Sequence, residues 1–433
     1  MVDFPTDNHG WSELLSPRLV VDSIQGVHRV PWVIVGGGLT GLSCARRLAE
    51  LYPNDEVLLL DARLIGQGAS GRNSGFAVGV SHFPGPYKIQ DKENIDRVNR
   101  INQAGLALLD QQITSQSIHC QWDNNGFHHG AADTMSIKEH GHFVNYLDAI
   151  EAEHNSLNED DMKSRFGTSL YKAGVHVKTG ALVQPAALVR GLANNIPSNV
   201  RLIENCPVLK IKSGRTIKIT TSSGEITTDK LVLATNYEAP KIGFLKRRVL
   251  GSTLSGSFTR ILTPQELATL GSHESWGIIS LHSGGATLRL TSDGRISLRN
   301  TAEYNGGALL SPQALKRRQI THRNSFEKRF PQLAEVPFEF AWSGVEGISR
   351  NDTNFFGQQS KNIFLAGGYN GSGVSRGTAF GYALAEYAGG GQSELITDCL
   401  SSKAATWLPP RPFLDLGAVL KVKARFQGAG LDR

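Results

Sequence analysis

Residues 32–61 read WVIVGGGLTGLSCARRLAELYPNDEVLLLD, and this stretch decides the fold of the chain. Its apolar run 33–35 is typical of a strand that is buried on both faces of a parallel sheet. The run leads into Gly36, Gly38 and Gly41, which match the G-x-G-x-x-G spacing. The first glycine permits a tight turn, the second lets a pyrophosphate approach the backbone, and the third lets a helix pack on the strand. The stretch therefore predicts a dinucleotide phosphate bound at a helix N-terminus.

The second strand of this unit is the apolar run 57–60, which ends at Asp61. Asp61 follows Gly41 by twenty residues, where a carboxylate can accept hydrogen bonds from the hydroxyls of an adenosine ribose. A carboxylate at this place disfavours a 2′-phosphate. The sequence therefore predicts FAD or NAD in preference to NADP.

The composition is that of a globular protein with room for two or three domains, since the chain has 433 residues and 40% of them are hydrophobic. The net charge of +6 comes without a long basic run with interleaved aromatics, so we expect no nucleic-acid binding. The N-terminus lacks the apolar core of a signal peptide, and no apolar stretch approaches the ~20 residues that cross a bilayer. Four cysteines lie far apart without C-x-x-C spacing. We therefore expect reduced thiols, a cytoplasmic location and no metal site.

A second glycine-rich segment, residues 62–79, reads ARLIGQGASGRNSGFAVG directly after the nucleotide unit. Glycines let backbone N–H groups come close to a ligand, and Arg72 lies in the middle of the segment. The segment is therefore either a second contact with a cofactor or a flexible loop with a surface arginine. The sequence leaves these two interpretations open.

The spacing of apolar residues predicts how the rest of the chain is organised. Residues 94–112 and 135–166 have a helical pattern, whereas 287–299 alternate around Ser292-Asp293-Gly294, a strong hairpin signal. The predicted fold class is α/β, with a discontinuous Rossmann-like nucleotide-binding domain and an antiparallel-sheet substrate domain with helices. The nucleotide domain is assigned residues 31–90, 175–245 and 341–395, the substrate domain residues 91–174 and 246–340, and a C-terminal tail residues 396–433.

One motif near the C-terminus favours a different function, that of a hydrolase. Gly373, Ser375 and Gly377 satisfy the G-x-S-x-G pattern of a hydrolase nucleophile elbow. In that fold the catalytic histidine follows the serine, but no histidine occurs after His322. The predicted strand also ends several residues before Ser375. We therefore reject the hydrolase interpretation.

Four motifs together resemble the FAD-dependent D-amino-acid oxidase and glycine oxidase family over nearly the whole chain. They are VIVGGGLTGL at 33–42, GASGRNSG at 68–75, ITTDKLVLATN at 226–236 and NIFLAGGYNGSGVSRGTAFGYALAE at 362–386. GASGRNSG and LRLTSDGR at 288–295 most resemble the branch that contains γ-glutamylputrescine oxidase. The resemblance implies FAD, two domains with crossing connections, and oxidation of an amine.

The cofactor-binding residues expected from these motifs come from separate parts of the chain. They are Gly36, Gly38, Leu39, Thr40, Gly41, Asp61, Ala62, Arg63, Gly68, Ala69, Ser70, Arg72, Asn73, Ser74, Val208, Thr235, Gly368, Gly371, Ser372, Gly373 and Val374.

The chain departs from the family pattern at one informative place. Glycine-oxidase-like members carry a W-x-G-L-R-P motif whose arginine binds the substrate carboxylate, but residues 342–347 here read WSGVEG. Glu346 thus replaces the arginine, which removes bidentate carboxylate binding and favours a cationic amine, unless the side chain is turned away into a salt bridge. Trp342, Tyr369 and Phe76 are candidate walls of the amine pocket, or equally core residues. This stretch has no cysteine of the kind to which sarcosine-oxidase-like relatives attach flavin, so we expect noncovalent FAD.

The resulting hypothesis is oxidation of a small amine at its C–N bond. Hydride would pass from the carbon beside the nitrogen to flavin N5, and the imine would hydrolyse in water. No catalytic base is assigned, because none is strictly needed. The electron acceptor is either O₂ or a quinone.

Several alternatives stay open at this point. One is an amino-acid oxidase or dehydrogenase in which Arg289 or Arg350 binds the carboxylate. Others are a nicotinamide-dependent dehydrogenase and a nucleotide-binding protein that holds FAD for structure only. The tail segment 409–426 is either an amphipathic helix on an anionic membrane or a helix packed on its own domain.

Overall fold

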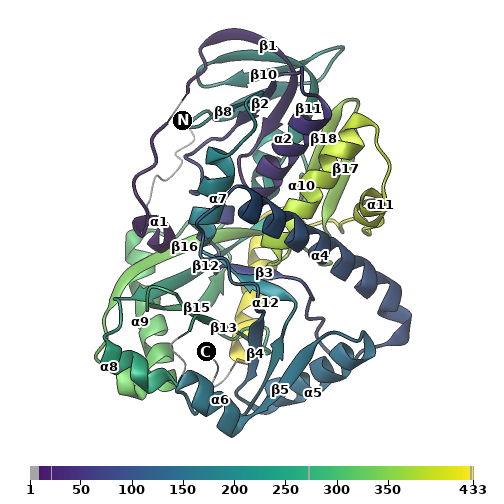
Figure 1. Cartoon of the computed structure of the whole chain (residues 1–433). Coiled ribbons are helices and arrows are strands. Elements are labelled where there is room, and N and C mark those ends of the chain that lie inside the picture. The colour runs from purple at the N-terminus through teal and green to yellow at the C-terminus, as the bar shows by residue number, and fades with distance from the viewer. Residues whose placement is uncertain (1–8, 21, 272–273, 430–431, 433) are drawn as a thin grey trace.

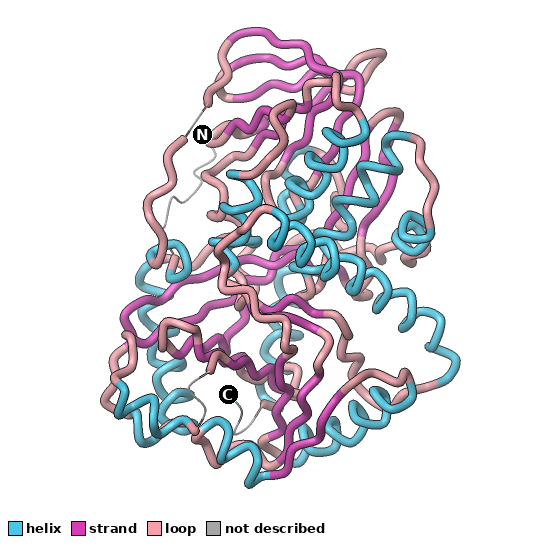
Figure 2. The backbone as a smooth tube through the Cα atoms, viewed as in Figure 1, coloured by secondary structure: helices cyan, strands magenta, loops and turns pink. Residues whose placement is uncertain are grey.

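Two large sheets organise the protein, whose computed structural model describes residues 9–20, 22–271, 274–429 and 432 (Figures 1 and 2). The first sheet contains β1 (Gly26–Val35), β2 (Val57–Leu60), β8 (Val200–Ile203), β9 (Val208–Lys212), β10 (Ile217–Thr221), β11 (Gly224–Leu233), β17 (Phe355–Ser360) and β18 (Ile363–Gly367). The second contains β4 (Phe127–Ala131), β5 (His154–Asn158), β6 (Ala173–Val177), β12 (Val249–Thr259), β13 (Trp276–Ser280), β14 (Thr287–Leu290), β15 (Ile296–Glu303) and β16 (Phe338–Ser349). A small sheet pairs β3 (Phe76–Val78) with β7 (Gly180–Leu182).

The helices pack around these sheets (Figure 1). They are α1 (Gly10–Glu13), α2 (Leu39–Leu51), α3 (Ala69–Arg72), α4 (Lys92–Ser115), α5 (Thr134–Ala149), α6 (Glu159–Phe166), α7 (Pro185–Asn194), α8 (Pro264–Leu267), α9 (Pro312–Arg329), α10 (Gly373–Gly389), α11 (Glu394–Leu400) and α12 (Phe413–Gln427).

The first sheet confirms the predicted nucleotide unit of strand, glycine turn, helix and strand. β1 runs parallel to both β2 and β11, and α2 begins just after the glycine turn. Alternate residues of β1 enter different cores, because Ile34 packs against α2 and α10 while Val33 and Val35 face the opposite side of the sheet. Both faces are therefore buried, as the unbroken apolar run predicts.

The second sheet confirms the predicted hairpin and is antiparallel except for the pair β4 and β13. β14 and β15 pair around the turn with Leu288 opposite Leu298. Leu298 packs with Phe326 of α9 on one face of the sheet. This leaves the opposite face to form a wall of a cavity.

Three segments differ from what the sequence pattern indicates. The range 135–166 is not helical throughout, because β5 lies between α5 and α6. β6 and β16 both pair within the second sheet, although the predicted division assigns most of their residues to the nucleotide domain. Strand pairing overrides a linear division here, since a strand belongs to whichever sheet satisfies its backbone hydrogen bonds.

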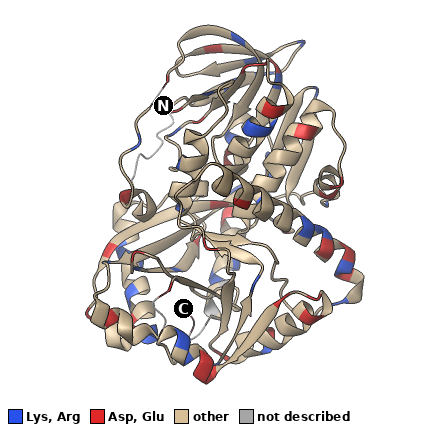
Figure 3. Cartoon of the chain, in the orientation of Figure 1, with Lys and Arg blue, Asp and Glu red and all other residues tan. Residues whose placement is uncertain are grey.

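Basic and acidic residues are interspersed along the chain in Figure 3. Lys and Arg alternate with Asp and Glu along α4, in keeping with the modest net charge of +6. Among the described residues, no helix combines the length and hydropathy that a bilayer span requires.

We predict that Gly41→Ala destabilises the fold. A Cβ at Gly41 would lie 1.8 Å from the carbonyl oxygen of Gly36, so α2 would have to move off β1. Overpacking of this kind should lower the melting temperature by roughly 5 °C or more. The matched control is Gly141→Ala in α5, where a Cβ would meet nothing within 4 Å. Calorimetry should show an unchanged or slightly raised melting temperature for the control, and equal effects of the two substitutions would contradict the prediction.

Candidate active site

One cavity of about 1190 Å³ extends between the two sheets and collects residues from all parts of the chain. All of the predicted cofactor-binding residues line it except Gly41 and Gly368. All four predicted substrate residues, Phe76, Trp342, Glu346 and Tyr369, line it too. Gly41 and Gly368 lie behind the wall, where each lacks room for a Cβ.

The nucleotide end of the cavity is built around Asp61. The backbone N–H of Gly37 donates to Asp61 Oδ2 at 2.7 Å, and that of Arg63 donates to Oδ1 at 2.8 Å. Burial raises the pKa of Asp61 to about 6, although these two hydrogen bonds act in the opposite direction. A Cβ at Gly38 would come within 2.7 Å of Ser70 Oγ, so only glycine lets the turn lie this close to the second glycine-rich segment. A carboxylate beside this glycine cradle suits the ribose and pyrophosphate of a dinucleotide.

The second glycine-rich segment is an ordered part of the cavity wall. Arg72 is buried, so the interpretation as a loop with a surface arginine is wrong. Its guanidinium donates to the carbonyl oxygens of Gln67 at 2.8 Å and Ser343 at 2.9 Å. Trp342 Nε1 donates in turn to the carbonyl oxygen of Arg72 at 3.1 Å. Arg72 thereby joins this loop to β16.

The third piece of the site comes from the C-terminal turn between β18 and α10. Tyr369 and Thr40 join their hydroxyl groups at 2.7 Å, which ties this turn to the N-terminus of α2. The N–H of Gly368 donates to Asn236 Oδ1 at 2.8 Å. Ser375 is buried inside the first turn of α10, well past the end of β18, so it does not form a nucleophile elbow.

The floor of the cavity is one row of residues across six strands of the second sheet. Strand register pairs them successively, and the row runs His129, Ile279, Thr287, Arg299, Gly256 and Trp342. All six line the cavity. Arg299 therefore lies at the middle of the floor, where its guanidinium donates to the hydroxyl of Thr287.

The two arginines proposed from the sequence as carboxylate ligands do not line the cavity. Arg289 is fully buried and donates to the carbonyl oxygens of Gly75 and Val183 beneath the glycine-rich loop. Arg350 is exposed at the end of β16, where it contacts the tail. Arg299 takes their place as a cationic group of the cavity. The sequence did contain a signal for Arg299. It lies two residues after Ser297 in the strand that follows the hairpin turn, and residues two apart in a strand share one face, here a face of β15.

Glu346 is half-buried on the wall formed by β16, next to the C-terminal turn. A Cβ at Gly371 would lie 3.5 Å from Glu346 Oε2. The side chain thus faces the cavity near the turn that begins α10. Trp342 is more deeply packed, with ring centroids 4.8 Å from Phe258 and 6.3 Å from Trp11. Trp11 belongs to the N-terminal segment, in which the sequence showed no functional signal.

The far end of the cavity holds a cluster of histidines that the sequence analysis did not assign to the site. His82 Nε2 lies 2.8 Å from Glu139 Oε1, and both residues line the cavity. Neither ring nitrogen of buried His129 has a hydrogen-bond partner. Burial, with His82 and His128 nearby, lowers the pKa of His129 well below its ordinary value, so its ring is neutral. His128 faces the other way and stacks on His176, as expected for neighbours in a strand.

The comparisons with known proteins agree with this geometry. A family model described as DAO, FAD dependent oxidoreductase, matches residues 31–387. The chain belongs to this family. It is 27% identical to a probable oxidoreductase, OrdL, of Rhizobium meliloti over 401 residues, covering 89% of this chain and 90% of that protein. It is 25% identical to γ-glutamylputrescine oxidoreductase of Escherichia coli over 413 residues, covering 92% of this chain and 90% of that protein.

Solved structures show the same DAO-family fold. Glycine oxidase from Geobacillus kaustophilus superposes with a TM-score of 0.72 at 16% identity, covering 85% of this chain and 96% of that chain. This confirms the predicted fold class and the resemblance stated from the motifs. The protein is accordingly an FAD-dependent oxidoreductase, and the glycine cradle with Asp61 fits the adenosine half of FAD.

We predict that FAD affinity rises with pH through about 6, the pKa of Asp61. Ribose hydroxyls donate more strongly to the ionised carboxylate, so FAD binding favours loss of the proton. Titrating apoprotein with FAD by fluorescence should show binding weaker by roughly tenfold at about pH 5 than at about pH 8. Asp61→Asn should bind weakly at both pH values. The control Asp229→Asn alters an exposed carboxylate of β11 and should behave as wild type, whereas a pH dependence retained in Asp61→Asn would contradict the assignment.

Proposed function

We propose that this protein oxidises the C–N bond of a small amine, with Glu346 selecting for positive charge in the substrate. The observation that carries the proposal is the position of Glu346 on the cavity wall beside Gly371. A carboxylate there attracts an ammonium group and repels a carboxylate, so it reverses the preference of the arginine found in glycine-oxidase-like motifs. The name of the relative γ-glutamylputrescine oxidoreductase, at 25% identity, supports an amine substrate.

The chain's own residues have three tasks in this reaction. The floor and the aromatic wall, including Phe76 and Trp342, exclude water and hold the substrate carbon in place. The N-terminus of α10, at Gly373, would stabilise negative charge at the pyrimidine side of the cofactor. Bound FAD would supply N5 as hydride acceptor, and water would hydrolyse the substrate imine to a carbonyl and a free amine.

Noncovalent FAD remains part of the proposal. The four cysteines are free and buried, and the one that lines the cavity, Cys206, donates its backbone N–H to the carbonyl of Asp61 at the nucleotide end. No cysteine among the described cavity residues lies near the loop 68–75 or the turn 371–374. Free thiols in the core also support a cytoplasmic location. The acceptor that reoxidises the cofactor is O₂ or a quinone.

A second candidate is oxidation of a substrate that carries a carboxylate, and Arg299 is the observation that favours it. Its guanidinium lies on the cavity floor, a position that suits an anionic group of the substrate. Strand register places Arg299 in the row of Gly256 and Trp342, four residues along β16 from Glu346, so an amine whose carboxylate lies several bonds away is the class that suits both charges. A simple α-amino acid would place its carboxylate near Glu346 instead and be repelled.

We expect purified protein to be yellow and to bleach near 450 nm when mixed anaerobically with its substrate. A panel of monoamines, diamines, ω-amino acids and α-amino acids would identify the class by the rate of bleaching. Acid precipitation should release the flavin into solution, because attachment is noncovalent. A colourless protein would favour the nicotinamide alternative. A flavin that no amine or amino acid bleaches would be structural, and either result would refute the proposed function.

We predict opposite selectivity changes from the two charged positions. Glu346→Arg should lower kcat/KM for diamines by roughly tenfold or more and raise kcat/KM for substrates that carry a carboxylate. The reason is that the charge at this position of the cavity wall changes sign. Arg299→Met should leave plain amines nearly unchanged and weaken ω-amino acids. Arg350→Met, outside the cavity, is the matched control and should alter neither. If no substrate responds to either cavity variant, these two side chains do not contact the substrate.

A further inference from the structure

The outer face of α12 is an apolar surface that the fold leaves uncovered. Among the described residues sixteen large apolar side chains are exposed, and five of them fall between 407 and 420. They are Trp407, Phe413, Leu416, Val419 and Leu420, with 46–68% of each side chain exposed. Single exposed apolar residues are ordinary, but a cluster of this kind marks an interaction surface.

The helix has two distinct faces. Phe413, Leu416 and Leu420 follow the three- and four-residue spacing that places side chains on one side of a helix. The other side, with Val422 and Phe426, lines the cavity. α12 is therefore both a wall of the active site and an exposed surface.

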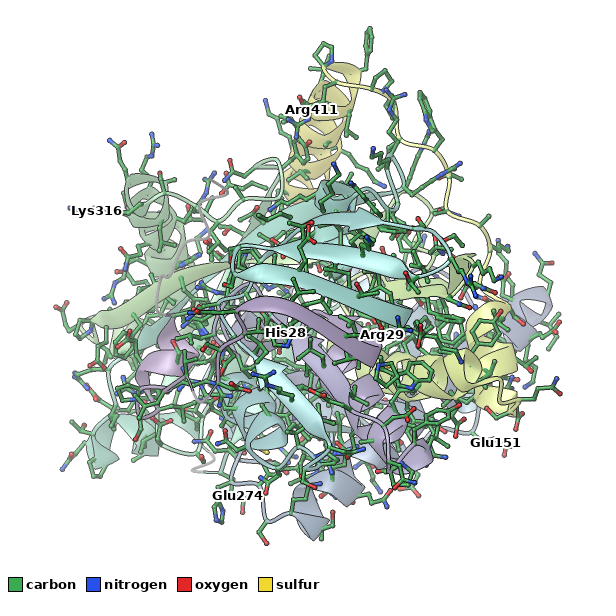
Figure 4. All side chains as sticks on the ribbon, turned by 90° about the horizontal axis from the view of Figure 1, so that it is seen from above. His28, Arg29, Glu151, Glu274, Lys316 and Arg411 are labelled. Atoms are coloured by element: carbon green, nitrogen blue, oxygen red, sulfur yellow. The ribbon has the colours of Figure 1, made fainter. Side chains whose placement is uncertain are left out.

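The helix is held firmly against the protein at both ends. Near its start, Tyr304 donates to Asp415 Oδ1 at 2.8 Å. Beyond its end, Asp432 accepts hydrogen bonds from buried Arg329 and from Ser280. Figure 4 shows α12 in yellow, projecting from the body with Arg411 at its outer end. The outer face is thus presented by a fixed helix that stands out from the surface.

A cluster of basic residues adjoins the apolar face, and we call Lys246, Arg247, Arg248 and Arg350 the basic collar. All four side chains are exposed. Arg248 donates to the carbonyl oxygen of Ala405 at 2.8 Å, and Arg350 donates to that of Trp407 at 3.5 Å. The Arg247 guanidinium lies 5.7 Å from the centre of the Trp407 ring. The collar therefore borders the segment that leads into α12.

Further positive charge lies on the helix itself, at exposed Lys423, while Lys421 is exposed and also lines the cavity. The acidic residue in the first turn is Asp415, whose Oδ1 lies 3.2 Å from Arg411 Nε. The opposite charges of this ion pair cancel. The surface thus combines an apolar centre with a cationic border. It would repel a second copy of itself, because both copies would bring the same charge to the contact.

We propose that the outer face of α12 and the basic collar dock this protein on an anionic membrane surface. An interfacial helix buries its apolar side chains at the boundary of the lipid headgroups, while lysines and arginines contact anionic lipids. Trp407 suits the same boundary, since its ring has an apolar body and a polar N–H. Docking places the wall of the cavity next to the membrane without any span across it. The inference is independent of which amine the enzyme oxidises.

The test is sedimentation of the full-length holoprotein with lipid vesicles. It should pellet with vesicles that contain about 30% phosphatidylglycerol and stay in solution with pure phosphatidylcholine, and about 0.5 M salt should release it. Triple substitution Phe413→Ser, Leu416→Ser and Leu420→Ser should reduce binding by about tenfold or more. The matched control is Ile89→Ser, Ile261→Ser and Ile320→Ser, which removes three side chains of similar exposure elsewhere and should bind as wild type.

A second pair of variants separates the contribution of charge to vesicle binding from that of the apolar side chains. Arg247→Gln with Arg248→Gln should weaken binding to anionic vesicles, whereas Lys210→Gln with Lys218→Gln, exposed on the first sheet, should not. Flavin absorbance and melting temperature verify that each variant is folded. Brominated lipids should quench the fluorescence of wild type more than that of Trp407→Phe.

Three results would overturn the proposal. The first is no pelleting with anionic vesicles. The second is equal binding of wild type and the α12 triple variant. The third is a wild-type dimer that does not bind vesicles, together with a triple variant that is a monomer. The partner of this surface would then be a second copy of the chain.

Discussion

The close packing of α2 against β1 and α10 is the constraint on which the rest of the structure depends. A Cβ at Gly41 would collide with the Gly36 carbonyl, and one at Gly381 would lie 2.2 Å from the Thr40 carbonyl. Both glycines let backbones approach where any side chain would hold them apart. This contact brings the N-terminus of α2 to the cavity and places Thr40 within hydrogen-bonding distance of Tyr369. Segments more than 300 residues apart in the chain thereby line one cavity.

The cavity carries charges of opposite sign on its wall and on its floor, at Glu346 and Arg299. Glu346 and Arg299 lie on different strands of one sheet, and neither is close to the other in sequence. Electrostatic attraction is stronger where water is excluded, and the proposed function rests on this, because two charges of opposite sign would select a substrate with complementary ends. Neutral His129 at the far end adds a polar group without adding charge.

The C-terminal tail connects the cavity to the surface. Of the two interpretations that the sequence left open, packing on the protein is confirmed, because α12 lines the cavity and Asp432 is held by Arg329. Only one face of α12 packs on the protein, however, since the side chains of Phe413 and Leu416 remain exposed. A helix with one face in a cavity wall and the other toward solvent can serve both roles that its sequence suggested.

The sequence by itself determined the nucleotide unit, because its glycine spacing, buried strand and Asp61 follow rules that act within thirty residues. It also predicted the hairpin around Gly294, whose turn chemistry is equally local. Only the tertiary structure decided which arginine faces the cavity. Arg289 and Arg299 lie on one hairpin and on the same face of the sheet, but Gly75 and Val183 cover Arg289 and leave Arg299 open to the cavity. That cover comes from distant segments, so no local pattern in the hairpin could reveal it.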